Sequence, residues 1–122
     1  MAIKERGVDA KDDCVFCRII KGELPSTKVY EDDSVLVFRD INPAAPTHLL
    51  VVPKQHVARL SECGPGDRDL IADVMLAAAK VAGMEDLDAY RLIINDGAGA
   101  GQTVFHLHAH VLGGTPMAEK LL

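Results

Sequence analysis

The sequence predicts an α+β fold: a five-stranded antiparallel sheet with one long helix and one or two short helices. Five segments are rich in β-branched and aliphatic residues and are bounded by turn-forming residues, as strands are. One stretch has a sustained helical spacing of apolar residues. Strands and helices do not alternate along the chain, which argues against the βαβ units of a parallel sheet.

The chain has 122 residues, of which 48% are hydrophobic, and this suits one domain with one buried core. Residues 1–13 are polar and have no clear period, so we expect a mobile N-terminal arm before a single domain over residues 14–122. The arm has no apolar segment of the kind found in a secretory signal. Residues 14–22 predict a short helix, capped by Asp12 or Asp13 and ended by Gly22.

The strands are expected to begin with a hairpin, because two short apolar runs flank Asp32 and Asp33. The third run is almost entirely apolar and ends in Pro53, which is typical of a central strand. Residues 56–63 predict one or two helical turns. The last two strands flank a glycine-rich loop over residues 95–103. The five expected strands are residues 29–31, 34–38, 48–53, 90–94 and 105–112.

The long helix is expected over residues 67–82, with aspartates in its first turn and Gly83 at its end. Its apolar residues form two adjacent stripes, which is wider than the single face that a monomer needs to bury. We therefore expect a homodimer to which this helix contributes. The stripes are Leu70, Val74, Ala77, Ala78 and Val81, and Ile71, Met75, Ala79 and Ala82.

Composition and charge exclude several classes of partner. The net charge is −5 with no block of like charge, which argues against a dedicated nucleic-acid surface. No apolar run is long enough to cross a membrane, so no membrane partner is expected. Three cysteines are an odd number in a chain without a secretory signal. A disulfide framework is therefore disfavoured, and a reducing, cytoplasmic location is expected.

The candidate catalytic pattern is the alternation of His106, His108 and His110 with apolar residues. Alternate side chains of a strand share a face, so the three imidazoles are expected to line a cleft. The preceding glycine-rich loop lets backbone N–H groups approach an anion, and the combined donor set suits a phosphate. His108 is flanked on both sides and is the best-placed nucleophile for a nucleotidyl-histidine, provided that its other nitrogen keeps a proton on an acceptor.

The candidate metal pattern is Cys14 and Cys17, whose spacing suits a tetrahedral metal. A redox pair and two buried apolar side chains are the alternative interpretations. A thioredoxin-like pair is disfavoured because its βαβ setting is absent. Two imidazoles would complete a Cys2His2 site, and His48 and His106 are the candidates, so we favour structural zinc.

These patterns together resemble the histidine triad (HIT) superfamily. The alternating histidines match its signature, and the loop and strand around them resemble the histidine triad nucleotide-binding (Hint) branch. The cysteine pair is similar to that of zinc-retaining members. The resembling segments are residues 14–26, 30–33, 38–43, 45–56, 95–114 and, for the signature itself, 106–112.

The resemblance implies that purine nucleoside monophosphates bind and that nucleotide phosphoramidates are cleaved. It makes His108 the nucleophile, places Thr103 at the phosphate and leaving group, and lets His110 address the phosphate. Members pair through the long helix and an adjacent strand. The implied zinc ligands are Cys14, Cys17, His48 and His106. The implied nucleotide-binding residues are Phe16, Ile19, Phe38 and Ile41 at the base, Asp40 at the ribose, Asn95 at the ribose–phosphate side, and Gly101, Gln102, Thr103, His108 and His110 at the phosphate.

We therefore expect a purine nucleoside phosphoramidate hydrolase, acting on adenylyl-lysine or aminoacyl-adenylate types of substrate. Three alternatives stay open: a nucleotide-binding or scaffold protein with vestigial turnover, a dinucleoside polyphosphate hydrolase, and a metallohydrolase whose triad histidines hold a catalytic ion. Turnover of an adenosine phosphoramidate would distinguish the expected hydrolase from the first alternative. Activity that is retained after metal removal would disfavour the last.

Overall fold

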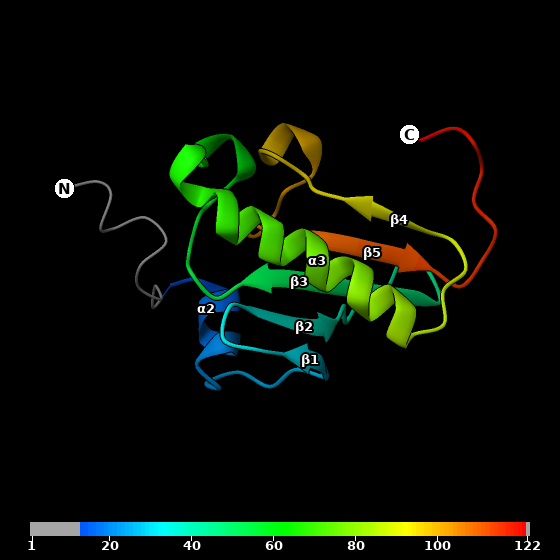
Figure 1. Cartoon of the computed structure of the whole chain (residues 1–122), viewed down its shortest axis with the longest axis horizontal. Coiled ribbons are helices and arrows are strands. Elements are labelled where there is room, and N and C mark those ends of the chain that lie inside the picture. Colours follow the sequence, from blue (N-terminus) through cyan, green and yellow to red (C-terminus); the bar gives the residue numbers. More distant parts are fainter. Residues whose placement is uncertain (1–12, 122) are drawn as a thin grey trace.

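The chain folds into the expected sheet-and-helix arrangement, which the computed structural model describes for residues 13–121. Apart from Asp13, the expected N-terminal arm lies outside the described residues. The strands pair in the order β1-β2-β3-β5-β4, and every pairing is antiparallel, which confirms the predicted fold class (Figure 1). The strands are β1 (Lys28–Glu31), β2 (Val35–Arg39), β3 (Thr47–Pro53), β4 (Tyr90–Ile93) and β5 (Ala109–Gly113), and the helices are α2 (Val15–Ile20) and α3 (Arg68–Met84).

Both faces of the sheet are covered. α3 lies across one face (Figure 1), where Val74 and Val81 pack among the odd-numbered residues of the central strands. α2 packs on the opposite face through Phe16 and Ile19. Because side chains alternate along a strand, the even-numbered residues of β3 and β5 lie on the α2 side. The residues under α3 are Val35, Val37, Leu49, Val51, Ala109 and Val111, and those under α2 are Leu36, Phe38, Leu50 and Val52.

The histidine strand is shorter than expected. β5 begins at Ala109, so His106 and His108 lie in the irregular segment before it. The register of β3 with β5 would place Leu107 opposite Pro53, which has no N–H to donate to a ladder. The Leu107 N–H donates instead to the Val57 carbonyl. The missing partner explains why the alternating sequence pattern does not continue as a strand.

The long helix also ends later than the sequence indicates. α3 runs through Gly83 to Met84, and the left-handed residue after it is Asp86, with φ of 57°. The Leu87 N–H donates to the Ala82 carbonyl at 3.0 Å and the Asp86 N–H to the Gly83 carbonyl at 3.1 Å, which is a Schellman motif. Aspartate tolerates this conformation better than most residues. Gly83 was therefore the wrong stop signal.

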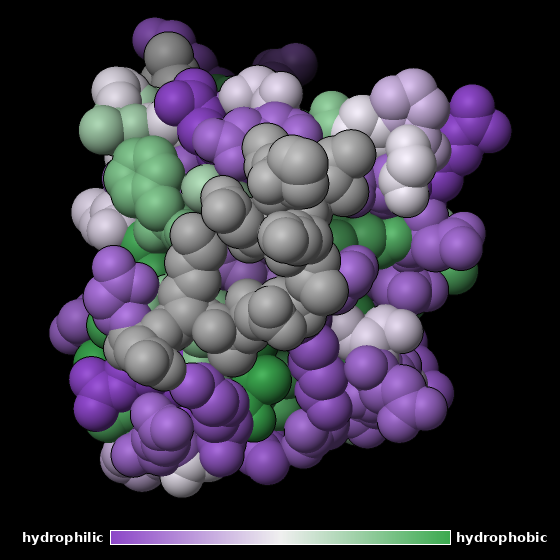
Figure 2. Space-filling model, turned by 90° about the vertical axis from the view of Figure 1, so that its left-hand side faces the viewer, coloured by the Kyte–Doolittle hydropathy of each residue, from purple (hydrophilic) through white to green (hydrophobic). Residues whose placement is uncertain are grey.

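The surface that faces the viewer in Figure 2 is the left-hand end of Figure 1. Its coloured atoms are mostly hydrophilic, and the hydrophobic residues form small separate groups. Of the helices in residues 13–121, none is long and apolar enough to span a membrane.

Candidate metal centre and catalytic pocket

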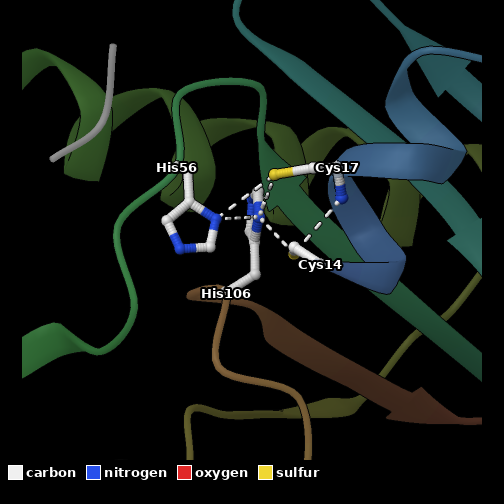
Figure 3. A group of neighbouring side chains, drawn as sticks. All are labelled: Cys14, Cys17, His56 and His106. Atoms are coloured by element: carbon white, nitrogen blue, oxygen red, sulfur yellow. Dashed lines mark hydrogen bonds between the residues drawn. The ribbon is translucent and has the colours of Figure 1, made fainter. Parts of the chain in front are cut away.

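Four buried side chains from three parts of the chain converge beside α2: Cys14, Cys17, His56 and His106 (Figure 3). Cys14 is the N-cap of α2, and its sulfur accepts from the Cys17 N–H at 3.4 Å. This cap brings both thiols to the same end of the helix. His56 comes from the loop after β3, and His106 comes from the segment before β5.

The spacing of the four ligand atoms fits a tetrahedral ion. The Nδ1 atom of His106 lies 3.5 Å from each sulfur and 3.2 Å from Nδ1 of His56, which lies 3.2 Å from the Cys17 sulfur. Zinc with bonds of about 2.3 Å to sulfur and about 2.05 Å to nitrogen gives tetrahedron edges of about 3.6 Å for S···N and about 3.3 Å for N···N. The cluster is thus already arranged to hold a metal ion.

The protonation of His106 suits this role. Its Nε2–H donates to the Pro53 carbonyl at 2.7 Å, so its Nδ1 lone pair points at the sulfurs. The pKa of His106 is lowered to about 4, mainly by burial; the hydrogen bond to the Pro53 carbonyl opposes the shift, and the neighbouring His56 and His108 add to it. The imidazole is therefore neutral and ready to bind a cation near neutral pH.

The structure corrects the expected fourth ligand, because His48 does not reach this cluster and His56 does. His48 is the second residue of β3, whereas the cluster lies near Pro53 at the other end of that strand. Five residues of extended chain separate the two ends by about 17 Å. His56 is only three residues beyond Pro53, so the end of the strand at this proline was the sequence signal that could have identified His56 as a ligand.

A cavity of about 440 Å³ lies on the α2 side of the sheet, next to the metal cluster. Its walls come from α2, β2, the loop after β2, and the segment that leads into β5. The structure brings together most of the residues that the sequence predicts for nucleotide binding. Those that line the cavity are Phe16, Ile19, Phe38, Asp40, Ile41, Thr103, His108 and His110.

His108 meets the condition set for a nucleophile. Its Nδ1–H donates to the His106 carbonyl at 2.7 Å, which leaves the Nε2 lone pair for the cavity. The ring lies edge-on to Phe16, with centroids 5.0 Å apart. Burial lowers the pKa of His108, so the imidazole is unprotonated at neutral pH.

A chain of hydrogen bonds fixes the opposite tautomer in His110. The Ala44 N–H donates to Nδ1 of His48 at 2.9 Å, so the proton of a neutral His48 sits on Nε2. That Nε2–H donates to Nδ1 of His110 at 2.9 Å, and His110 must carry its own proton on Nε2. Within residues 13–121 this buried Nε2 has no hydrogen-bond partner. His110 lines the cavity and is therefore an unused N–H donor beside the His108 lone pair.

The pKa values agree with a neutral pair. The pKa of His110 is lowered to about 4, mainly by burial and also by His108 and His48, whereas Asp40 opposes the shift. Burial also lowers the pKa of His48, against the attraction of Asp40. Both imidazoles are uncharged near neutral pH, so the tautomers decide what each nitrogen can do.

The same hydrogen bonds argue against a catalytic metal. Among the described residues, the three triad imidazoles do not form a common ligand group. Asp40, His48 and His110 do approach one another closely enough for a metal. However, the Ala44 N–H occupies Nδ1 of His48, so Nε2 carries the proton and has no lone pair for a cation.

Three predicted phosphate-side residues, Asn95, Gly101 and Gln102, are not among the described residues that line the cavity. The Gln102 side chain is buried and accepts from the Gly97 N–H at 2.8 Å. Its amide donates to the Ala58 carbonyl at 2.8 Å and to the Val104 carbonyl at 3.1 Å. The Gln102 side chain therefore braces the glycine-rich loop, and its expected place at the phosphate stays a prediction.

The chain is similar to proteins of one known family. The HIT domain family matches residues 21–117. A HIT-like protein from Synechocystis is 47% identical over 108 residues, which are 88% of this chain and 95% of the relative. Among solved structures, a HIT family hydrolase from Clostridium thermocellum is 51% identical with a TM-score of 0.89, over 92% of this chain and 99% of that one.

Two further solved structures have informative names. A Zn-bound histidine triad family protein from Mycobacterium smegmatis is 35% identical with a TM-score of 0.76, over 88% of this chain and 78% of that one. A histidine triad nucleotide-binding protein from Candida albicans is 33% identical with a TM-score of 0.75, over 89% of this chain and 86% of that one. Since the family match spans most of its length and includes all three alternating histidines, this chain belongs to the HIT domain family.

Proposed function

We propose that the protein hydrolyses purine nucleoside phosphoramidates through a covalent intermediate on His108. The observation that carries the proposal is the pair of opposite tautomers: a lone pair on His108 beside an unused N–H on His110, with ring centroids 5.0 Å apart. Phosphoryl transfer needs such a nucleophile next to a donor for the phosphoryl oxygens. The names of the Clostridium hydrolase and the Candida nucleotide-binding protein agree with this proposal.

The cavity offers a place for each part of a nucleotide. Phe16, Ile19 and Phe38 supply an apolar wall suited to a purine base. One carboxylate oxygen of Asp40 accepts from the Asn42 N–H at 2.8 Å, and the other lies 3.4 Å from Nε2 of His48. Asp40 lines the cavity, where its carboxylate suits ribose hydroxyls. A volume of about 440 Å³ lies within the range of small-molecule sites.

The proposed reaction has two balanced halves. Nε2 of His108 attacks phosphorus, and the P–N bond breaks with its electron pair on the amine, which takes a proton delivered through the Thr103 hydroxyl. The imidazolium that forms keeps its Nδ1–H on the His106 carbonyl. Water then attacks phosphorus, loses a proton back towards Thr103 and displaces the neutral imidazole. The nucleoside monophosphate and the free amine are the products.

We also propose that Cys14, Cys17, His56 and His106 hold zinc. The tetrahedral spacing and the thiolate–imidazole donor set suit this ion, and the related Mycobacterium protein is named as Zn-bound. Bound zinc would stabilise the fold by joining α2, the loop after β3 and the segment before β5. Because the His106 carbonyl orients His108, the same ligands also support the nucleophile.

The test of the proposed function is a product assay with adenosine 5′-phosphoramidate, in which released AMP is separated by chromatography. We expect AMP and ammonia as products, and we expect slower cleavage of a diadenosine polyphosphate at the same concentration. Tight AMP binding without AMP release would favour the scaffold alternative. Faster cleavage of the dinucleotide would favour the polyphosphate hydrolase alternative.

We further propose that the chain forms a homodimer through α3. The first apolar stripe of the helix is buried in the core, but Met75 and Ala79 of the second stripe are exposed, with Met75 at 43%. A second copy would cover these side chains around a two-fold axis. Light scattering at micromolar concentration should give the mass of two chains, and the mass of one chain would refute the dimer.

A further inference from the structure

A second cavity, of about 370 Å³, adjoins the candidate catalytic pocket. The two cavities share three wall residues, Val15, Thr103 and Val104. Of the nucleotide-binding residues that line the first cavity, Thr103 is the one that also lines the second. The remaining lining residues of the second are Asp13, Cys14, His56, Ala58 and Phe105.

Phe105 is the feature of this cavity that the fold does not explain. Alternation along the expected strand puts Phe105 on the same face as Leu107 and Ala109, which are buried, yet Phe105 is 42% exposed. It lines the second cavity and does not line the first. An exposed aromatic ring at the wall of a cavity is a common contact surface for apolar ligands, because it offers a large area at a small entropic cost.

Thr103 lies where the reacting phosphoryl group would meet both cavities. A phosphoryl group under attack must lie within reach of Nε2 of His108, and Thr103 lies on the wall between the cavities. In phosphoryl transfer the leaving atom departs roughly in line with the attacking atom. The leaving group therefore departs on the side of phosphorus away from Nε2 of His108, and the second cavity, which meets the first at Thr103, offers adjoining space for it.

We propose that the second cavity binds the leaving amine of the substrate, with Phe105 as its aromatic wall. This inference rests on the proposed function and specifies its substrate class: purine nucleoside phosphoramidates whose amine carries an apolar or aromatic body. Val104 and Ala58 add apolar surface. The Asp13 carboxylate at the same cavity suits an amine product that is protonated after it leaves.

The experiment compares two substrates that differ only in the leaving group. One is adenosine 5′-phosphoramidate, whose leaving group is ammonia, and the other carries phenethylamine on phosphorus. The wild type is expected to prefer the phenethyl substrate in kcat/KM. Phe105→Ala should lower kcat/KM for that substrate by about tenfold and leave the unsubstituted one within about twofold.

Two further variants serve as controls. Phe105→Leu keeps an apolar side chain and should retain part of the preference, which guards against a folding defect in the alanine variant. Leu60→Ala truncates a residue of similar exposure, 37%, that lines neither cavity, and it should leave both substrates unchanged.

The outcomes separate the subsite from the proposed function. If Phe105→Ala slows both substrates equally, the ring acts on the neighbouring histidines and the subsite is wrong. If it slows neither, the amine lies elsewhere and the subsite is also wrong, although the hydrolase proposal stands. If the wild type cleaves neither substrate, the proposed function and the subsite fail together.

Discussion

Replacing His108 with asparagine is expected to reduce turnover of an adenosine phosphoramidate by more than about 10⁴-fold, the upper range for loss of one acid–base group. The loss should be this large because the covalent route disappears with Nε2. The asparagine amide can still donate to the His106 carbonyl, so the pocket and AMP binding should persist. Steady-state kinetics and AMP titration calorimetry on the same preparation measure both effects.

Thr103→Ala is the matched comparison for His108→Asn. It removes a hydroxyl from the shared wall but leaves the nucleophile, so its loss should stay within about 10²–10⁴-fold. A His108→Asn protein that turns over within about tenfold of the wild type would refute covalent catalysis. The metallohydrolase interpretation would then gain support.

The second large effect is expected at the metal centre, where His56→Ala should abolish metal binding and strongly destabilise the fold. Structural zinc sites contribute apparent binding free energies of about 10–16 kcal/mol in small domains. Elemental analysis of protein purified without a metal-affinity tag should give about one equivalent of zinc in the wild type and below about 0.1 equivalent in the variant. Thermal unfolding with and without a chelator should show the matching loss of stability.

His48→Ala is the control for His56→Ala, because the sequence pattern assigns the metal to His48 and the structure does not. It should keep its zinc and its chelator-sensitive stability. Its turnover should fall, since His110 loses the donor that keeps its proton on Nε2. Metal loss in His48→Ala, or a full equivalent in His56→Ala, would contradict the observed ligand set.

The parts of the fold that depend on local patterns could be predicted from the sequence. Strands β1 to β4 and both helices lie within a few residues of their expected positions, because periodic apolar residues and turn residues determine them locally. One difference occurs where a residue distant in the sequence decides the outcome: Pro53, on the neighbouring strand β3, prevents β5 from beginning before Ala109. The other difference is local: the sequence predicts that α3 ends at Gly83, but the Schellman motif forms at Asp86, three residues later.

The candidate site shows the same division. The residue types and most of the cavity wall could be predicted, since the histidine and cysteine patterns are local. The choice of His56 over His48 as a metal ligand could not be predicted, because it depends on which end of β3 lies near α2. The tautomers of His108 and His110 could not be predicted either, because the folded backbone places the Ala44 N–H and the His106 carbonyl that fix them.

The central claim is a nucleotidyl group on His108, and its most direct test is intact-mass analysis of the wild type during turnover. The protein is mixed rapidly with the phenethyl phosphoramidate and quenched without acid, because phosphorus–histidine bonds are acid-labile. We predict one added nucleotidyl group per chain, located by fragmentation to the peptide that contains His108, and formed at least as fast as AMP is released. Full turnover with no adduct at any time, or an adduct on another residue, would contradict this account.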